Sequence, residues 1–178
     1  MKARLATVAL GGCSGCHMSF LDMDERLLEL AARVELVYGP FVDAKEVPTR
    51  VDLALVEGAV ANEEHLALLR RVRKRTRVLV ALGDCAVSGN VTALRNAYGS
   101  ALPVLDRVYL DGAVLGAAIP EEPGILPRLL DRVLPVHHVV KVDHFLPGCP
   151  PHADLVHALL SALLAGKDPA LAGKVRFG

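Results

Sequence analysis

The chain has 178 residues, of which 52% are hydrophobic and 4% aromatic, and its 20 Lys and Arg balance 20 Asp and Glu, so that the formal net charge is zero. This length suffices for one domain with a proper core. A neutral chain of this composition excludes the electrostatic footprint of a nucleic-acid-binding protein and a basic membrane patch. Because the sequence shows no signal peptide and no apolar run of membrane-spanning length, we expect a cytoplasmic location.

Short apolar runs alternate with helical patterns along the chain. The first run, residues 4–10, is too short for a helix and enters the glycine-rich stretch Gly11–Gly15, which predicts a buried strand feeding a loop. Further strands are predicted at residues 34–38, 51–56, 77–82 and 139–143. Helices are predicted over residues 18–30, after the N-cap Asn62, around 93–98, near 126–134 and over 154–165. Residues 99–135 read as a long excursion rich in Pro and Gly.

This alternation predicts an α/β fold, with a flavodoxin-like, doubly wound parallel sheet and helices on both faces. We expect a single domain over residues 1–178, in which 167–178 form a surface tail. In such a sheet, ligands bind at the carboxyl ends of the strands. Three strands end there in marked loops: the stretch after the first strand, Glu57-Gly58 after the third, and Gly83-Asp84-Cys85 after the fourth.

The four cysteines are the candidate site residues. Cys13, Cys16, Cys85 and Cys149 all stand in stretches flanked by Gly or Pro that read as loops, and none lies in a predicted helix or core run. Cysteines used for packing would be scattered among such runs, because free Cys is commonly buried. In a cytoplasmic protein, metal or redox chemistry is the more frequent use of such cysteines than a structural disulfide.

The spacing of these cysteines favours an iron–sulfur cluster. One C-x2-C pair, Cys13 and Cys16, is joined by two single cysteines from distant loops. A cubane tolerates this spacing because each of its corner irons needs only one thiolate, and a Cys-Pro pair such as Cys149-Pro150 recurs in iron–sulfur ligation. A zinc site, which more often uses two C-x2-C pairs, a redox disulfide and packing roles remain alternatives.

Several motifs together resemble the small subunit of nickel–iron hydrogenases. They are, in order, Gly12-Cys13-Ser14-Gly15-Cys16, Glu57-Gly58, Gly83-Asp84-Cys85-Ala86 and Pro147-Gly148-Cys149-Pro150-Pro151. The string from Ser19 to Leu28 is most similar to the soluble, NAD-reducing type. The resemblance implies that the four cysteines bind one proximal [4Fe-4S] cluster, which faces the nickel–iron centre of a separate large subunit.

The resemblance also implies an enzyme subunit with defined partners. It would carry electrons between the large subunit and a diaphorase module that holds FMN, further clusters and NAD. The related NADH dehydrogenase subunit has adjacent cysteines where this chain has C-x2-C, and no cysteine follows Cys149, so the chain resembles a one-cluster version. The rival hypotheses are another cytoplasmic hydrogenase with a different acceptor and a zinc-stabilised α/β scaffold. FMN in this subunit is supported by no glycine-rich phosphate motif.

Two polar residues near the predicted site have open roles. Glu57 ends a buried-looking strand and is either a local hydrogen-bonding carboxylate or, as the resemblance implies, a contact at the large-subunit interface. For His17, directly after Cys16, we favour a solvated or interfacial side chain over a hydrogen-bond donor to a cluster sulfur.

Overall fold

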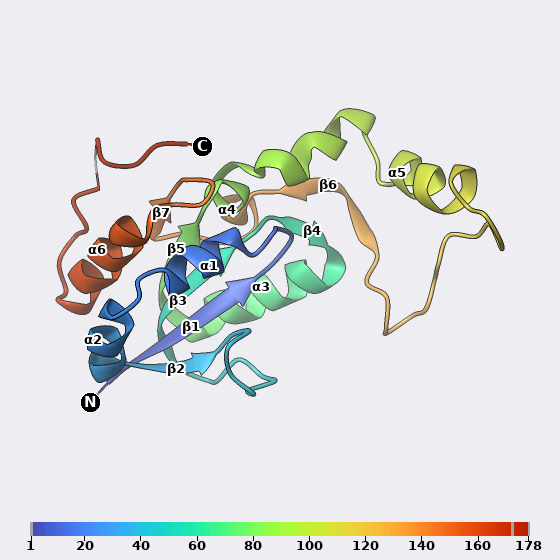
Figure 1. Cartoon of the computed structure of the whole chain (residues 1–178). Helices are drawn as coiled ribbons and strands as arrows, with labels where there is room; N and C mark the ends of the chain where they lie inside the picture. Colours follow the sequence, from blue (N-terminus) through green and yellow to red (C-terminus); the bar gives the residue numbers. More distant parts are fainter. Residues whose placement is uncertain (1, 172, 178) are drawn as a thin grey trace.

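A five-stranded parallel sheet forms the centre of the computed structural model, which describes residues 2–171 and 173–177 (Figure 1). Neighbouring strands follow the order β2-β1-β3-β5-β7 and every pair is parallel. Their bounds are β1 (Ala3–Ala9), β2 (Val34–Tyr38), β3 (Val51–Glu57), β5 (Thr76–Leu82) and β7 (His144–Leu146). Counted within the sheet, this is the 2-1-3-4-5 order of flavodoxin-like proteins. The predicted fold class is therefore confirmed.

The two faces of this sheet carry separate apolar clusters, because successive side chains of a strand point to opposite faces. On one face, Leu53 and Leu55 of β3 pack in a cluster with residues of α1 (Gly15–Leu21), α2 (Arg26–Arg33) and α6 (Ala153–Leu164). On the other face, Ala54 and Val56 pack in a cluster with residues of α3 (Glu63–Arg75). The central strands are buried on both faces, which explains their near-continuous Ala, Val and Leu content.

The predicted helix over residues 18–30 is wrong as a single element. The chain forms α1 and α2, separated by a turn in which Asp24 adopts a positive φ of 50°. Both helices carry apolar side chains at helical spacing, so the sequence pattern runs on through the break. The prediction of Asn62 as an N-cap is confirmed, since its side-chain oxygen accepts a hydrogen bond from the His65 amide at 2.8 Å.

Two further predictions fail between β5 and α6. The stretch predicted as a helix near 126–134 contains β6 (Leu129–Leu134), which pairs antiparallel with the unpredicted β4 (Val60–Asn62). The last strand of the sheet is β7, not residues 139–143. Asp143 directly precedes β7 and contacts β5 through its side chain, which accepts a hydrogen bond from the Leu79 amide at 2.8 Å. A short 3-10 helix, η3 (Val136–His138), comes before this stretch.

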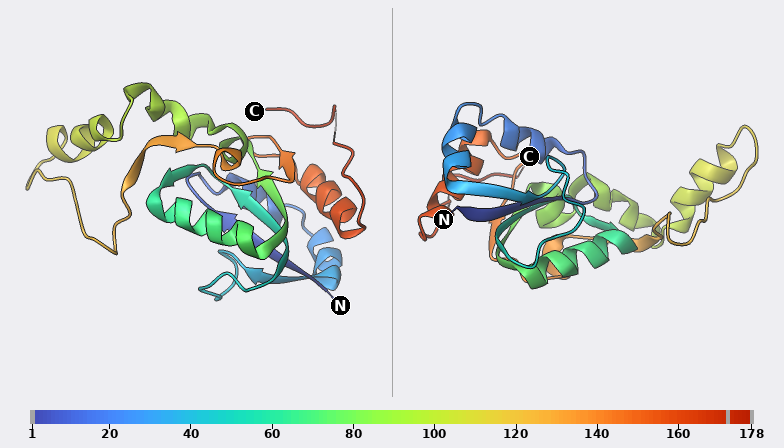
Figure 2. Two further views of the ribbon diagram at one scale, coloured as in Figure 1. Left: turned by 180° about the vertical axis from the view of Figure 1, so that it is seen from behind. Right: turned by 90° about the horizontal axis from the view of Figure 1, so that it is seen from below.

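After β5 the chain leaves the central sheet through α4 (Asp84–Ser88) and the 3-10 helix η1 (Asn90–Tyr98). The predicted excursion, residues 99–135, follows, and it contains α5 (Leu102–Asp106), a π-helical turn, η2 (Arg107–Asp111), and β6. We call residues 99–128 the arm. Both views of Figure 2 show the arm projecting away from the sheet and its helices.

The predicted surface tail, residues 167–178, is described except at positions 172 and 178. Within it, Leu171 and Val175 pack against the apolar cluster on the α6 face of the sheet. Among the described residues, no helix has the length and apolar character needed to cross a lipid bilayer.

Candidate metal centre

The structure brings the four cysteines to the carboxyl edge of the sheet. Cys13 lies in the loop after β1 and Cys16 in the first turn of α1, while Cys85 stands in α4 directly after β5 and Cys149 follows β7. Two of the predicted loop positions are therefore helical, because the first turns of α1 and α4 start as soon as their strands end. Cys13 and Cys149 are exposed, whereas Cys16 and Cys85 are partly buried.

The thiols are close enough to influence one another. Burial, followed by the negative charge of Glu57 and then by the other three cysteines, raises the pKa of Cys16 from its ordinary value of 9.0 to about 12. Burial is also the main cause that raises the pKa of Cys85, with Cys149 and Cys13 next. Four thiolates crowded at this edge would repel one another, so the arrangement favours a cation that neutralises them.

The raised pKa of Cys16 predicts a pH-dependent stability of the metal-free chain. Because the folded state holds the thiol proton more tightly than the unfolded state, this stabilisation is present below pH 9 and is lost as pH rises toward about 12. Urea unfolding at a series of pH values measures the free energy of unfolding. This free energy should fall more steeply at alkaline pH in the parent chain than in Cys16→Ser. Equal losses in both chains would contradict this assignment.

Glycines let the backbone approach the sulfurs. Gly83 has a φ of +82°, and a Cβ built on it would overlap the Cys16 sulfur. A Cβ on Gly15 would lie 3.3 Å from the Cys13 sulfur, tighter than an ordinary contact. Asn90, at the start of η1, donates a hydrogen bond from its side-chain amide to the Cys149 sulfur at 3.4 Å. The cradle around the sulfurs is therefore built from three separate segments.

Buried hydrogen bonds fix these segments to each other. Asp84 is 3% exposed; its Oδ1 accepts the Gly148 amide at 2.6 Å, and its own amide donates to the Gly148 carbonyl at 2.9 Å. Asp84 therefore joins the Cys85 and Cys149 segments, beyond the local turn predicted for it. The Ser19 hydroxyl donates to the Pro151 carbonyl and ties α1 to the same loop. No pattern in the sequence marks Ser19 or Asn90 as part of this site.

Glu57 and His17 form a buried pair beneath the cysteine loop. Glu57 is 2% and His17 4% exposed, and one carboxylate oxygen, Oε2, lies 2.6 Å from both the backbone nitrogen and Nδ1 of His17. The favoured prediction of a solvated or interfacial His17 is wrong. Its ring packs edge-on against Phe41, with a centroid distance of 5.5 Å. Glu57 therefore has the first of its two predicted roles, that of a hydrogen-bonding carboxylate inside the chain.

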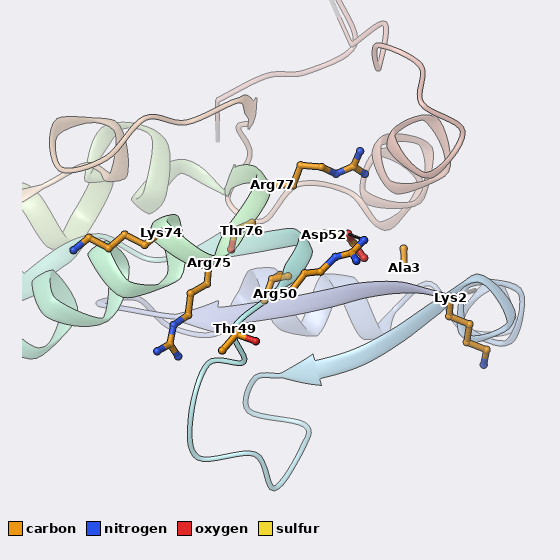
Figure 3. A pocket seen from close by; sticks show the side chains of 10 residues that line it. Lys2, Ala3, Thr49, Arg50, Asp52, Lys74, Arg75, Thr76 and Arg77 are labelled. Atoms are coloured by element: carbon orange, nitrogen blue, oxygen red, sulfur yellow. Dashed lines mark hydrogen bonds and ion pairs between the residues drawn. The ribbon is translucent and has the colours of Figure 1, made fainter.

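A surface hollow of about 530 Å³ lies at the amino edge of the sheet (Figure 3). It is lined by the beginnings of β1, β3 and β5 and by the end of α3, and includes Arg50, Lys74 and Arg77. At that helix end, Arg73 donates to the carbonyls of Thr76 and Arg77 at the start of β5 and so ties α3 to that strand. The hollow shares no residue with the cysteine site.

Comparison with known proteins identifies the family of the chain. The family model described as "NADH ubiquinone oxidoreductase, 20 Kd subunit" matches residues 13–163. The delta subunit of the NAD-reducing hydrogenase HoxS from Cupriavidus necator is 41% identical over 170 residues, which cover 93% of this chain and 80% of that subunit. The iron-sulfur subunit of the F420-non-reducing hydrogenase from Archaeoglobus profundus is 30% identical; the match covers 95% of this chain and 58% of that protein.

A solved structure extends this similarity to the whole fold. A chain of the NAD+-reducing [NiFe]-hydrogenase in its H2-reduced state superposes with a TM-score of 0.94, at 41% identity and over 100% of both chains. The chain belongs to the NADH ubiquinone oxidoreductase 20 kDa subunit family and is, within it, a hydrogenase small subunit similar to those of NAD-reducing nickel–iron hydrogenases.

Proposed function

We propose that this small subunit holds one [4Fe-4S] cluster on Cys13, Cys16, Cys85 and Cys149, and serves electron transfer between the nickel–iron site of a large subunit and a diaphorase module that reduces NAD. The observation that carries the proposal is the convergence of four thiols from separate segments on one edge of the sheet. The bound cluster would supply one-electron chemistry, which thiolate ligands and nearby hydrogen bonds tune.

The donor set suits a cluster better than zinc. In the described residues, no three His, Cys, Asp or Glu side chains converge on a point that a single metal ion could occupy. A structural zinc needs four ligands around one ion, with sulfur about 2.3 Å away. A cubane instead gives each thiolate its own iron and so accepts more widely separated sulfurs. This spacing favours iron–sulfur ligation over the zinc-scaffold hypothesis.

The exposed surface of the chain supports a large partner. The chain has a solvent-accessible surface of 10185 Å², whereas a compact monomer of 19.0 kDa is expected to have one of about 8,400 Å². The excess is larger than the roughly 800 Å² that one protein contributes to an interface of standard size. A subunit that remains covered in its complex explains this excess. The cysteine edge itself needs such a cover, because Cys13 and Cys149 are exposed in the single chain.

NAD is the acceptor that we propose, because the Cupriavidus relative and the superposed structure are both NAD-reducing. The Archaeoglobus relative belongs to a hydrogenase named for not reducing F420, so small subunits similar to this one also occur in hydrogenases that are not named for NAD. The chain itself contains no residue pattern that selects the acceptor, which therefore depends on the partner module.

Metal analysis and turnover test the proposal together. Anaerobically prepared protein is expected to contain about four irons and four labile sulfides per chain, with broad brown absorbance that bleaches on reduction. The native complex should reduce NAD+ with hydrogen. Stoichiometric zinc without sulfide would reject the cluster, and hydrogen uptake that reduces another acceptor but not NAD+ would reject the diaphorase partner alone.

A further inference from the structure

The position of the arm, residues 99–128, is not explained by packing of its side chains within this chain. From residue 102 to residue 132, all of which the structure describes, no side chain is buried. Val114 is 95% and Leu115 92% exposed, and they lie in the uncharged stretch 112–120. Other large apolar side chains of the arm are also exposed, among them Leu102, Val108, Ile125 and Leu126. Apolar surface of this extent marks an interaction site in a soluble protein.

The base of the arm is held firmly although the arm itself is not packed. Asn96 of η1 exchanges two hydrogen bonds with the backbone of Val133 in β6, at 2.8 and 2.7 Å. Arg95 donates to the carbonyls of Leu130 at 2.7 Å and Ala61 at 3.1 Å. The two ends of the arm are therefore fixed against β6 and β4, and the arm leaves the domain in a defined direction (Figure 1).

The arm is continuous with the cysteine edge. The segment that leads to it starts at Cys85 in α4 and passes Asn90, which contacts the Cys149 sulfur, before η1 carries the chain outward. A partner that covers the cysteines therefore meets η1 and then the arm. Along this path η1 exposes Val91, Leu94 and Tyr98, each at 62–72%. Exposed apolar side chains therefore follow the chain from the cysteine edge through η1 into the arm.

The comparisons indicate which partner this exposed surface fits. The match to each relative covers at least 93% of this chain, so the arm lies inside the matched region of an NAD-reducing hydrogenase and of an F420-non-reducing one. Both relatives are named as hydrogenase subunits, whereas only the Cupriavidus one is named for NAD, so we take the hydrogen-activating subunit as the partner common to both. The TM-score of 0.94 over both whole chains also indicates that the corresponding segment of the solved hydrogenase chain is placed in the same way.

We propose that the arm is a clasp that lies in an apolar groove of the hydrogen-activating large subunit and holds it over the cysteine edge. This inference rests on the proposed function, because it takes the large subunit as the partner. No charge opposes such burial in the central stretch 112–120, and the charged side chains of the arm stand on either side of it. An interface of this kind is the apolar, obligate type, in which the partners are stable only together.

Charge introduced at the tip of the arm tests the clasp. Val114→Asp combined with Leu115→Asp places two carboxylates where apolar burial is required, while Leu28→Asp, at a 76% exposed position in α2, is the matched control. The small subunit is affinity-purified from cells that express all subunits, and the large subunit that is recovered with it is measured. The double variant should recover at least about tenfold less large subunit than the parent, which corresponds to a loss of roughly 1.4 kcal/mol or more in binding free energy. The control should retain the parental yield.

The outcomes separate this inference from the proposed function. The double variant should keep the parental melting temperature and iron content, because neither side chain is packed within the chain. Parental recovery of the large subunit would overturn the clasp, as would selective loss of the diaphorase module. If the unmodified chain brings down no nickel-containing subunit, the proposed function fails instead. Trypsin gives an independent measurement: cleavage after Arg107 and Arg128 should be rapid in the isolated chain and blocked by the large subunit, and unblocked cleavage contradicts the clasp.

Discussion

Cys16→Ser is expected to remove the cluster and hydrogen-driven NAD+ reduction together. Serine replaces a soft thiolate with a poor ligand for iron. Cys16 is partly buried, and Gly83 approaches its sulfur so closely that no Cβ could stand there. A water molecule therefore has little room to replace the lost thiolate. Iron and sulfide analysis of anaerobically purified protein, followed by turnover of the assembled complex, measures both effects.

The same substitution at the other cysteines should remove different amounts of iron. Cys149 is exposed, so solvent can reach its corner of the cluster, and Cys149→Ser should retain more iron than Cys16→Ser. Met18→Ser is the control, because it changes an exposed side chain of α1 without removing a ligand. A full complement of iron and sulfide in Cys16→Ser would show that this residue is no ligand and would reject the four-cysteine site.

Much of the fold could be predicted because burial leaves a direct mark on the sequence. The strands β3 and β5 are covered on both faces and consist almost entirely of apolar residues, which sets their limits within one residue. Their parallel arrangement then places the chain after each strand at the same edge. For that reason Cys85 and the Cys13–Cys16 pair could be placed together from the order of the elements alone.

The contacts that hold the site could not be predicted in the same way. Asp84 binds Gly148 across 64 positions and Glu57 binds His17 across 40, and no periodicity records such pairs. The arm escapes prediction for the opposite reason. From residue 102 to residue 132 no side chain is buried, so this stretch has no buried face that would set a period in its sequence.

The buried Glu57 is expected to act on the site through its hydrogen bonds and through its charge, and two substitutions separate these effects. Glu57→Leu removes the acceptor for both the backbone amide and the ring of His17. Each buried donor left without an acceptor costs roughly 1–3 kcal/mol. Because His17 follows Cys16 directly in α1, we expect a lower unfolding temperature and incomplete cluster loading in this variant.

Glu57→Gln keeps an oxygen that can accept both hydrogen bonds and removes only the negative charge. That charge raises the pKa of Cys16, which shows that it acts at the sulfurs. Reduction adds negative charge to the site, so loss of a nearby anion should raise the reduction potential. An interaction of roughly 1.4 kcal/mol between this carboxylate and the added electron would correspond to a shift of about 60 mV.

A redox titration followed by electron paramagnetic resonance measures this shift on Glu57→Gln with a full iron content. Turnover of the assembled complex should fall, because a cluster at higher potential holds its electron more strongly against transfer to NAD+. Glu29→Gln, on the exposed side of α2, removes the same charge far from the cysteines and should leave the potential unchanged. If Glu57→Gln keeps both the parental potential and the parental turnover, Glu57 acts only through the hydrogen bonds that anchor His17, and its charge has no part in electron transfer.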